Sequence, residues 1–139
     1  MRLTKWVSGL ALALAANLAS AEDIPVGEKP TGWVERALFT TAIENREPGD
    51  VVVRVEGTPH DVYFFTELRQ LSGHTVTHRW EYGGEVVAEV PFEVGGPRWR
   101  VFSKKQLLAD QAGKWSVVVV DESGWVLHAE MFEYVPSPN

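Results

Sequence analysis

The sequence predicts an all-β fold, an immunoglobulin-like antiparallel β-sandwich of seven to eight strands with one short helix near residues 104–110. Short runs of strand-forming residues recur over about 100 residues and are separated by Gly, Pro, Asn and Asp. Apolar and polar residues alternate along several of these runs, which is typical of a sheet with one buried face. The number and length of the runs are those of an immunoglobulin-like domain.

The strand signals appear in eight places, in chain order. They lie near residues 34–43, 51–56, 62–68, 75–82, 85–94, 99–102, 115–121 and 126–134. Gly83 and Gly84 between the fourth and fifth runs supply the positive φ of a tight hairpin turn. The segment 121–124, which ends in Gly124, predicts a second hairpin between the last two strands.

Alternation in the run 75–82 indicates which side is buried. Val76, His78, Trp80 and Tyr82 share one side, and the other side carries Thr75, Thr77, Arg79 and Glu81. A strand with one apolar side belongs to an antiparallel sheet with one wet face. Two such sheets packed face to face form a sandwich, and we expect Trp80 to anchor its core.

The short helix is predicted from a capping pattern. Ser103 is followed three residues later by Gln106, just before Leu107 and Leu108. Ser at an N-cap position with Gln at the third helical position is a capping box. This pattern predicts a helix of one or two turns that begins near Lys104.

The first 21 residues have the three parts of a secretory signal. Arg2 and Lys5 precede a run of Leu and Ala over residues 7–18, and Ala19-Ser20-Ala21 closes it with small residues. The apolar run is shorter than the roughly 20 residues that span a membrane. We therefore expect a cleaved signal peptide and a periplasmic protein without an integral membrane segment, the alternative being an uncleaved anchor.

The remaining chain divides into three parts. Residues 22–32 are polar and carry two prolines and two glycines, so they predict a linker. The predicted β-domain covers residues 33–135, and residues 136–139 form a short tail.

The composition of the chain limits its partners and its chemistry. It has 13 Lys and Arg against 19 Asp and Glu, a net charge of −6. Loss of Arg2 and Lys5 with the signal would make it −8, which argues against nucleic acid as a partner. There is no cysteine, which excludes disulfides and thiolate chemistry.

Several stretches resemble a known bacterial family. They read VERALFTT at 34–41, VYFFTEL at 62–68, TVTHRWEY at 75–82, GGPRWRV at 95–101, GKW at 113–115 and VDESG at 120–124. They are similar to domain-of-unknown-function family 2914. The resemblance implies a small β-rich domain of envelope proteins with no established activity, and it assigns no catalytic residue.

Basic residues gather in one segment of this acidic chain. No acid lies between Glu93 and Asp110, whereas four cations do: Arg98, Arg100, Lys104 and Lys105. With Ser103 as the helix cap, free backbone N–H groups and the basic side chains predict contact with an anion such as a phosphate or carboxylate. The alternative is a solvated edge strand that its charges protect from aggregation.

Histidine and tryptophan offer weaker candidates. His74 and His78 are four apart in a strand, hence about 13 Å at roughly 3.3 Å per residue, too far to share one ion. His60 and His128 would have to converge with them through the fold. We therefore predict no metal site and no cofactor. His78 lies next to Trp80 on the expected inner face, so we expect a hydrogen-bonded, partly buried side chain, and it is also a candidate ligand contact. Trp125 follows Gly124 in a hairpin turn, and we expect it to be an exposed contact residue.

These observations favour a binding module over an enzyme. The sequence contains no nucleophile elbow, zinc-protease motif or phosphate loop, so no catalytic residue is predicted. We expect a non-catalytic periplasmic module that contacts an anionic envelope ligand (a glycan, phosphate or carboxylate) or another envelope protein. The alternative is a small envelope hydrolase or metal-handling protein that uses histidines.

Overall fold

The computed structural model describes residues 27–57 and 60–138, and these residues form an all-β fold, as predicted. The predicted signal peptide, residues 1–21, and the start of the predicted linker lie outside them. The described residues contain ten strands: β1 (Trp33–Thr40), β2 (Ile43–Glu44), β3 (Glu47–Pro48), β4 (Arg54–Glu56), β5 (His60–Arg69), β6 (Thr75–Tyr82), β7 (Glu85–Glu93), β8 (Arg98–Leu107), β9 (Gly113–Val120) and β10 (Val126–Val135). In the described part of the chain, no helix is long and apolar enough to cross a membrane.

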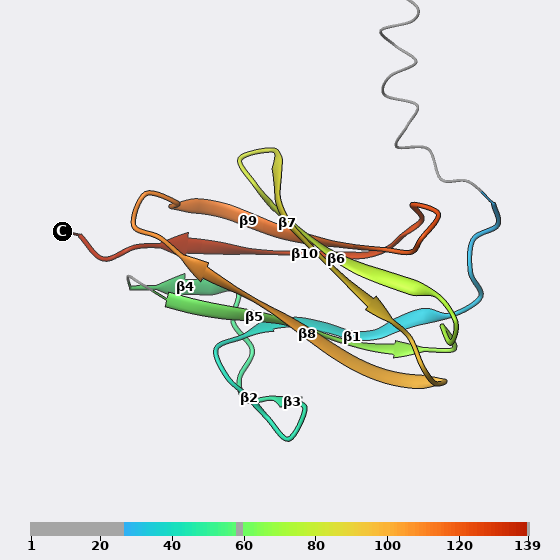
Figure 1. Cartoon of the computed structure of the whole chain (residues 1–139). Coiled ribbons are helices and arrows are strands. Elements are labelled where there is room, and N and C mark those ends of the chain that lie inside the picture. The colour runs from blue at the N-terminus through green and yellow to red at the C-terminus, as the bar shows by residue number, and fades with distance from the viewer. Residues whose placement is uncertain (1–26, 58–59, 139) are drawn as a thin grey trace, which may run out of the picture.

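The strands form two main sheets and a small hairpin. One sheet has three strands in the order β1-β5-β8, and the other has five in the order β4-β10-β9-β6-β7. Figure 1 shows the two sheets as layers, with the β2-β3 hairpin projecting beyond the three-stranded layer. All pairs within these sheets are antiparallel except β4 with β10, which run parallel over three residues.

Aromatic side chains from both sheets fill the space between them. Phe39 and Phe64 enter from the three-stranded sheet, and Trp80, Trp115 and Phe132 enter from the five-stranded sheet. The Phe39 ring lies 4.6 Å from Phe132 and 6.0 Å from Trp80, measured between ring centroids. Trp80 is fully buried, which confirms its predicted place in the core.

The predicted helix near residues 104–110 is wrong. Residues 98–107 form one continuous strand, β8, which pairs with β5 residue for residue from Arg98 to Leu107. Val101, Ser103 and Leu107 are buried at alternate positions, a period of two rather than the helical 3.6. A ten-residue neighbour supplies partners for the whole backbone of β8, and this tertiary pairing outweighs the local capping pattern.

The described residues form more strands than the predicted seven to eight because of short elements: the two main sheets together have eight, and the β2-β3 hairpin adds two. The first predicted run, 34–43, ends at Thr40, and the chain then forms the β2-β3 hairpin, whose strands have two residues each. Asn45 and Arg46 take positive φ of 53° and 61° in its turn, without the glycine that usually marks such a turn. The run 51–56 shortens to β4, and the run 99–102 lengthens to β8.

A buried histidine joins the two sheets. The Nε2 atom of His78 on β6 lies 2.9 Å from Oγ1 of Thr66 on β5, and its Nδ1 atom lies 2.8 Å from Oγ of Ser103 on β8. Trp80 donates its indole N–H to the same serine oxygen over 3.0 Å. All four side chains are buried, and burial lowers the pKa of His78 to about 3. The imidazole is therefore neutral in the folded protein at neutral pH.

This bridge makes the stability depend on pH. Between about pH 6.5 and 3 the unfolded chain binds a proton at His78 that the folded chain excludes, so the free energy of unfolding falls as the pH is lowered. The slope that His78 adds to the free energy of unfolding approaches about 1.4 kcal/mol per pH unit once the pH is below 6. Urea unfolding followed by tryptophan fluorescence at pH 5.0, 5.5, 6.0 and 7.0 should show this slope for the natural protein, and His78→Gln should remove it. Equal slopes for the two proteins would show that His78 takes up a proton in the folded state.

Candidate functional site: an arginine cluster on the three-stranded sheet

The face of the three-stranded sheet that points away from the core carries a set of charged residues. The strand register places Arg36 of β1 beside Glu67 of β5, and Glu67 beside Arg100 of β8. Arg69 and Arg98 are paired in the neighbouring row. We call this set, completed by Glu47 of β3, the arginine cluster. It consists of Arg36, Arg69, Arg98, Arg100, Glu47 and Glu67.

Glu67 lies at the centre of the cluster. Its side chain is only 3% exposed, and it accepts hydrogen bonds of 2.8 Å from the Nε atoms of Arg36, Arg69 and Arg98. Burial raises the pKa of Glu67, but the bonds from Arg98, Arg36 and Arg69 together outweigh it and lower the pKa to about 2. Glu67 is therefore ionised at neutral pH and fixes the direction of three guanidinium groups.

Glu47 attaches the β2-β3 hairpin to the cluster. Its two carboxylate oxygens accept bonds of 3.0 and 2.9 Å from Arg36, and one of them also accepts a bond from Arg100. Hydrogen bonds from Arg36 and Arg100 lower the pKa of Glu47 to about 2. The adjacent turn residue Arg46 donates to the backbone carbonyl of Arg100 over 2.7 Å. The hairpin therefore reaches across the sheet from β1 to β8.

The cluster carries more positive than negative charge. Four arginines face two glutamates, which leaves two positive charges unbalanced in a chain whose net charge is −6. Each of the three nitrogens of Arg36 already donates to a glutamate. Arg98 differs: its side chain is 52% exposed, and only its Nε is bonded to another described residue. Its terminal nitrogens are available for an anion.

Aromatic side chains continue the same face along the strands. The guanidinium carbon of Arg36 lies 4.8 Å from the ring centroid of Phe65. The rings of Tyr63 and Phe102 meet edge to face with centroids 6.3 Å apart, and Lys104 Nζ lies 6.0 Å from the Tyr63 ring. Phe102 is 39% exposed. The face thus offers cationic and aromatic groups side by side.

The predicted site residues do not form one patch. Arg98 and Arg100 lie in the cluster, and Lys104 is on the same face of β8. The alternation of a strand directs Lys105 to the opposite side. Ser103 and His78 lie in the core, and Ser103 caps no helix.

Trp125 is partly buried rather than free in solvent. Its indole N–H donates to the backbone carbonyl of Gly27 over 3.2 Å, which ties the hairpin turn to the segment that precedes the domain.

The sequence analysis did not predict four members of the arginine cluster: Arg36, Arg69, Glu47 and Glu67. Glu67 and Arg69 stand two apart in a strand and so share a face, which is the one signal that could have indicated them.

The histidines do not converge on one centre. Within the described residues, the one group of three potential metal ligands is His74, Asp121 and Glu122, whose ligand atoms lie within 4.8 Å of one another. His74 Nδ1 is already 2.9 Å from Glu122, and Thr75 N–H donates to the other oxygen of that carboxylate. Asp121 accepts three bonds from the turn that follows it. Turn formation accounts for this group without an ion.

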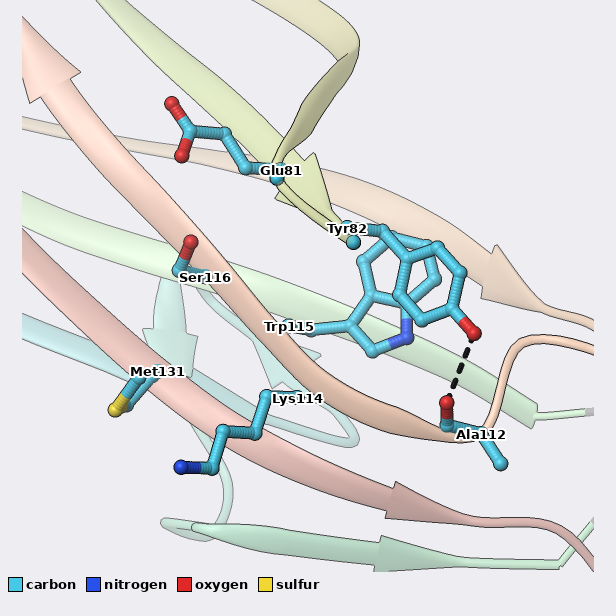
Figure 2. Close-up of a pocket in the computed structure, with 9 residues that line it drawn as sticks. Glu81, Tyr82, Ala112, Lys114, Trp115, Ser116 and Met131 are labelled. Atoms are coloured by element: carbon cyan, nitrogen blue, oxygen red, sulfur yellow. Dashed lines mark hydrogen bonds between the residues drawn. The ribbon is translucent and has the colours of Figure 1, made fainter.

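A hollow of about 390 Å³ lies on the other sheet, away from the cluster. Figure 2 shows Tyr82 stacked on Trp115 at one end, with Lys114 and Met131 at the other. The Tyr82 hydroxyl donates to the Ala112 carbonyl over 2.8 Å, and Trp115 is fully buried. The two rings pack against each other, and the buried Trp115 offers no surface to a ligand.

Removal of the Glu67 charge tests the electrostatics of the cluster. In Glu67→Gln the three arginines face a neutral amide, so we expect the free energy of unfolding at pH 7 to fall by about 3 kcal/mol. Because Glu67 has a folded pKa of about 2, this stabilisation is complete above pH 4.5 and is lost as the pH falls toward 2. Urea unfolding of both proteins should therefore show a difference that shrinks over this range. The exposed Glu93→Gln is the control, and it should change stability by less than about 0.5 kcal/mol. A Glu67→Gln protein as stable as the control would mean that the cluster is held together without this charge.

Comparison with known proteins gives a family and a partial structural likeness. No curated protein matches the chain. Among solved structures, it is similar to Pseudomonas fluorescens alkylpurine DNA glycosylase AlkC bound to DNA containing an abasic site analog, with 11% sequence identity and a TM-score of 0.49. The likeness covers 76% of this chain and 31% of that one.

The family model described as "Protein of unknown function (DUF2914)" matches residues 73–134. This segment runs from the turn before β6 into β10 and includes β8 with Arg98 and Arg100. The motifs at 34–41 and 62–68 lie outside it, so the resemblance there stays a prediction. Residues 73–134 of this chain therefore match the model of DUF2914, the family that the sequence motifs indicate.

Proposed function

We propose that this protein is a non-catalytic binding module that holds an anionic ligand at the arginine cluster. The observation that carries the proposal is the unbalanced charge around a buried carboxylate. A purely structural ion-pair network needs no excess of arginine, because each extra cation adds repulsion. An anion from outside would complete the charge balance.

Pre-organisation supports the same function. Glu67 holds Arg98 through Nε alone, so the terminal nitrogens of Arg98 are directed before a ligand arrives. Arg69 is held through both Nε and a terminal nitrogen, which fixes the neighbouring guanidinium more fully. Guanidinium groups bind carboxylate and phosphate oxygens in pairs, and a fixed guanidinium loses less entropy on binding. Lys104 on the same face adds a further cation along the strand.

The location follows from the predicted signal peptide, residues 1–21. Export would place the domain in the periplasm, where the anionic ligand is an envelope component. The packing of two sheets around Trp80 supports an immunoglobulin-like sandwich as the scaffold. In such a scaffold the arginine cluster lies on the face of a sheet and not on a group of loops. A flat face suits an extended ligand better than a small ligand, which binds in an enclosed pocket.

Binding of a labelled anionic polymer tests this function. Fluorescence anisotropy with dextran sulfate should show binding that weakens as salt is added, since the contacts are between exposed charges. Arg98→Ala should weaken binding about tenfold, because it removes the most exposed guanidinium of the cluster and leaves Glu67 with two arginines.

Lys114→Ala is the matched control. It removes one cation from the five-stranded sheet and should leave the affinity unchanged. Circular dichroism verifies that both variants are folded. Equal affinities for the natural protein and Arg98→Ala would contradict the proposed site.

A further inference from the structure

The strand that carries Arg98 and Arg100 is also an open edge of its sheet. β8 has ten residues and pairs with β5 on one side, and within the described residues no strand pairs with its other side (Figure 1). Its register with β5 continues without a bulge from Arg98 to Leu107, and it contains no proline. An edge of this length presents a row of backbone donors and acceptors to another chain.

The other edges of the two sheets are protected. β7 carries Pro91 and three exposed glutamates, Glu85, Glu89 and Glu93. β4 has three residues. β1 is interrupted by a register shift between Val34 and Arg36, and Phe39 at its end forms a bridge with Val52. Proline, short length and bulges are the usual means by which proteins prevent strand addition. β8 has none of these. Its edge is covered at one point, where Arg46 of the β2-β3 hairpin donates to the carbonyl of Arg100, and an added strand would displace that side chain. Elsewhere along β8 the cations limit what can pair with it.

Those cations select the partner. A second copy of β8 would bring arginines and lysines opposite one another, and like charges across a strand pair are destabilising. An acidic strand would be attracted by the same side chains. We therefore infer that an extended acidic polypeptide segment adds to β8 as a further strand, with its carboxylates opposite the cations of β8. The inference rests on the proposed function and names the class of its ligand.

The spacing of β8 defines the sequence that would fit. Arg98, Arg100, Phe102 and Lys104 alternate along the outer face. In an antiparallel addition, side chains directly opposite share a face, so the partner reads acid, any, apolar, any, acid, any, acid from its N-terminus. Its first acid meets Lys104, its apolar residue meets Phe102, and the last two acids meet the arginines. The seven residues span about 24 Å at roughly 3.4 Å per residue.

An extended polypeptide fits this edge better than an anionic polysaccharide does. Backbone hydrogen bonds supply affinity in strand addition, and alternate side-chain contacts supply specificity. A polysaccharide could contact the same arginines, but it would leave the repeating edge of donors and acceptors unused. The periodic match between the free backbone and the cations on one face therefore favours the polypeptide.

The labelled peptide Glu-Thr-Phe-Thr-Glu-Thr-Glu tests the inference by anisotropy with the full protein. We expect binding that Lys104→Glu weakens at least tenfold and that the control Lys114→Glu leaves unchanged. Two further peptides carry backbone N-methyl groups at either the odd or the even positions. In an antiparallel pair, alternate residues bond to the neighbouring strand, so one methylated peptide should lose binding and the other should keep it. Hydrogen exchange should slow at the β8 amides when the unmodified peptide binds.

The outcomes separate this inference from the function on which it rests. If both methylated peptides bind as well as the unmodified one, charge alone attracts the peptide and strand addition is wrong, while anion binding stands. If no peptide binds but dextran sulfate still does, the ligand is an anionic polysaccharide and the inference is again wrong. If neither binds, both the inference and the proposed function fail.

Discussion

The arrangement of this protein depends on one buried hydrogen-bonded bridge, from Thr66 through His78 to Ser103. The bridge links β6 of one sheet to β5 and β8 of the other. Buried polar groups are costly unless their partners are in place, so a shift of one sheet against the other would leave these groups unsatisfied. Apolar contacts alone tolerate several packings, whereas this bridge specifies one.

The bridge also sets what the opposite face displays. Because side chains alternate along a strand, fixing Thr66 and Ser103 inward directs their neighbours Glu67 and Phe102 outward. The register between β5 and β8 then aligns Glu67 with Arg100. The outer face is therefore not independent of the core. A buried carboxylate surrounded by guanidinium groups is stable only where the strands hold those groups in place, and the same constraint leaves the end of Arg98 in solvent.

Individual strands could be predicted from the alternation of apolar and polar residues in the sequence. Pairing between strands far apart in the sequence could not. The all-β class, the burial of Trp80 and the strand at residues 75–82 follow from apolar alternation. The helix near 104–110 failed because a capping box is a local signal, and the neighbour that overrode it, β5, lies about 40 residues away. Only two of the six cluster residues were predicted, for the same reason. Arg98 and Arg100 stand close together in sequence, but Arg36 and Glu47 reach them only through the fold.

The correction from helix to strand changes the chemistry of the basic segment. On a helix, the four cations and free N–H groups would have converged on a compact anion at one end. On a strand, Lys105 turns away and the other three cations spread along one face beside a free backbone edge. Charge spread at regular intervals favours a ligand whose own charges repeat with the same spacing, and a polypeptide in extended conformation has that spacing by construction. Secondary structure thus determines the shape of the ligand even where the residue types stay the same.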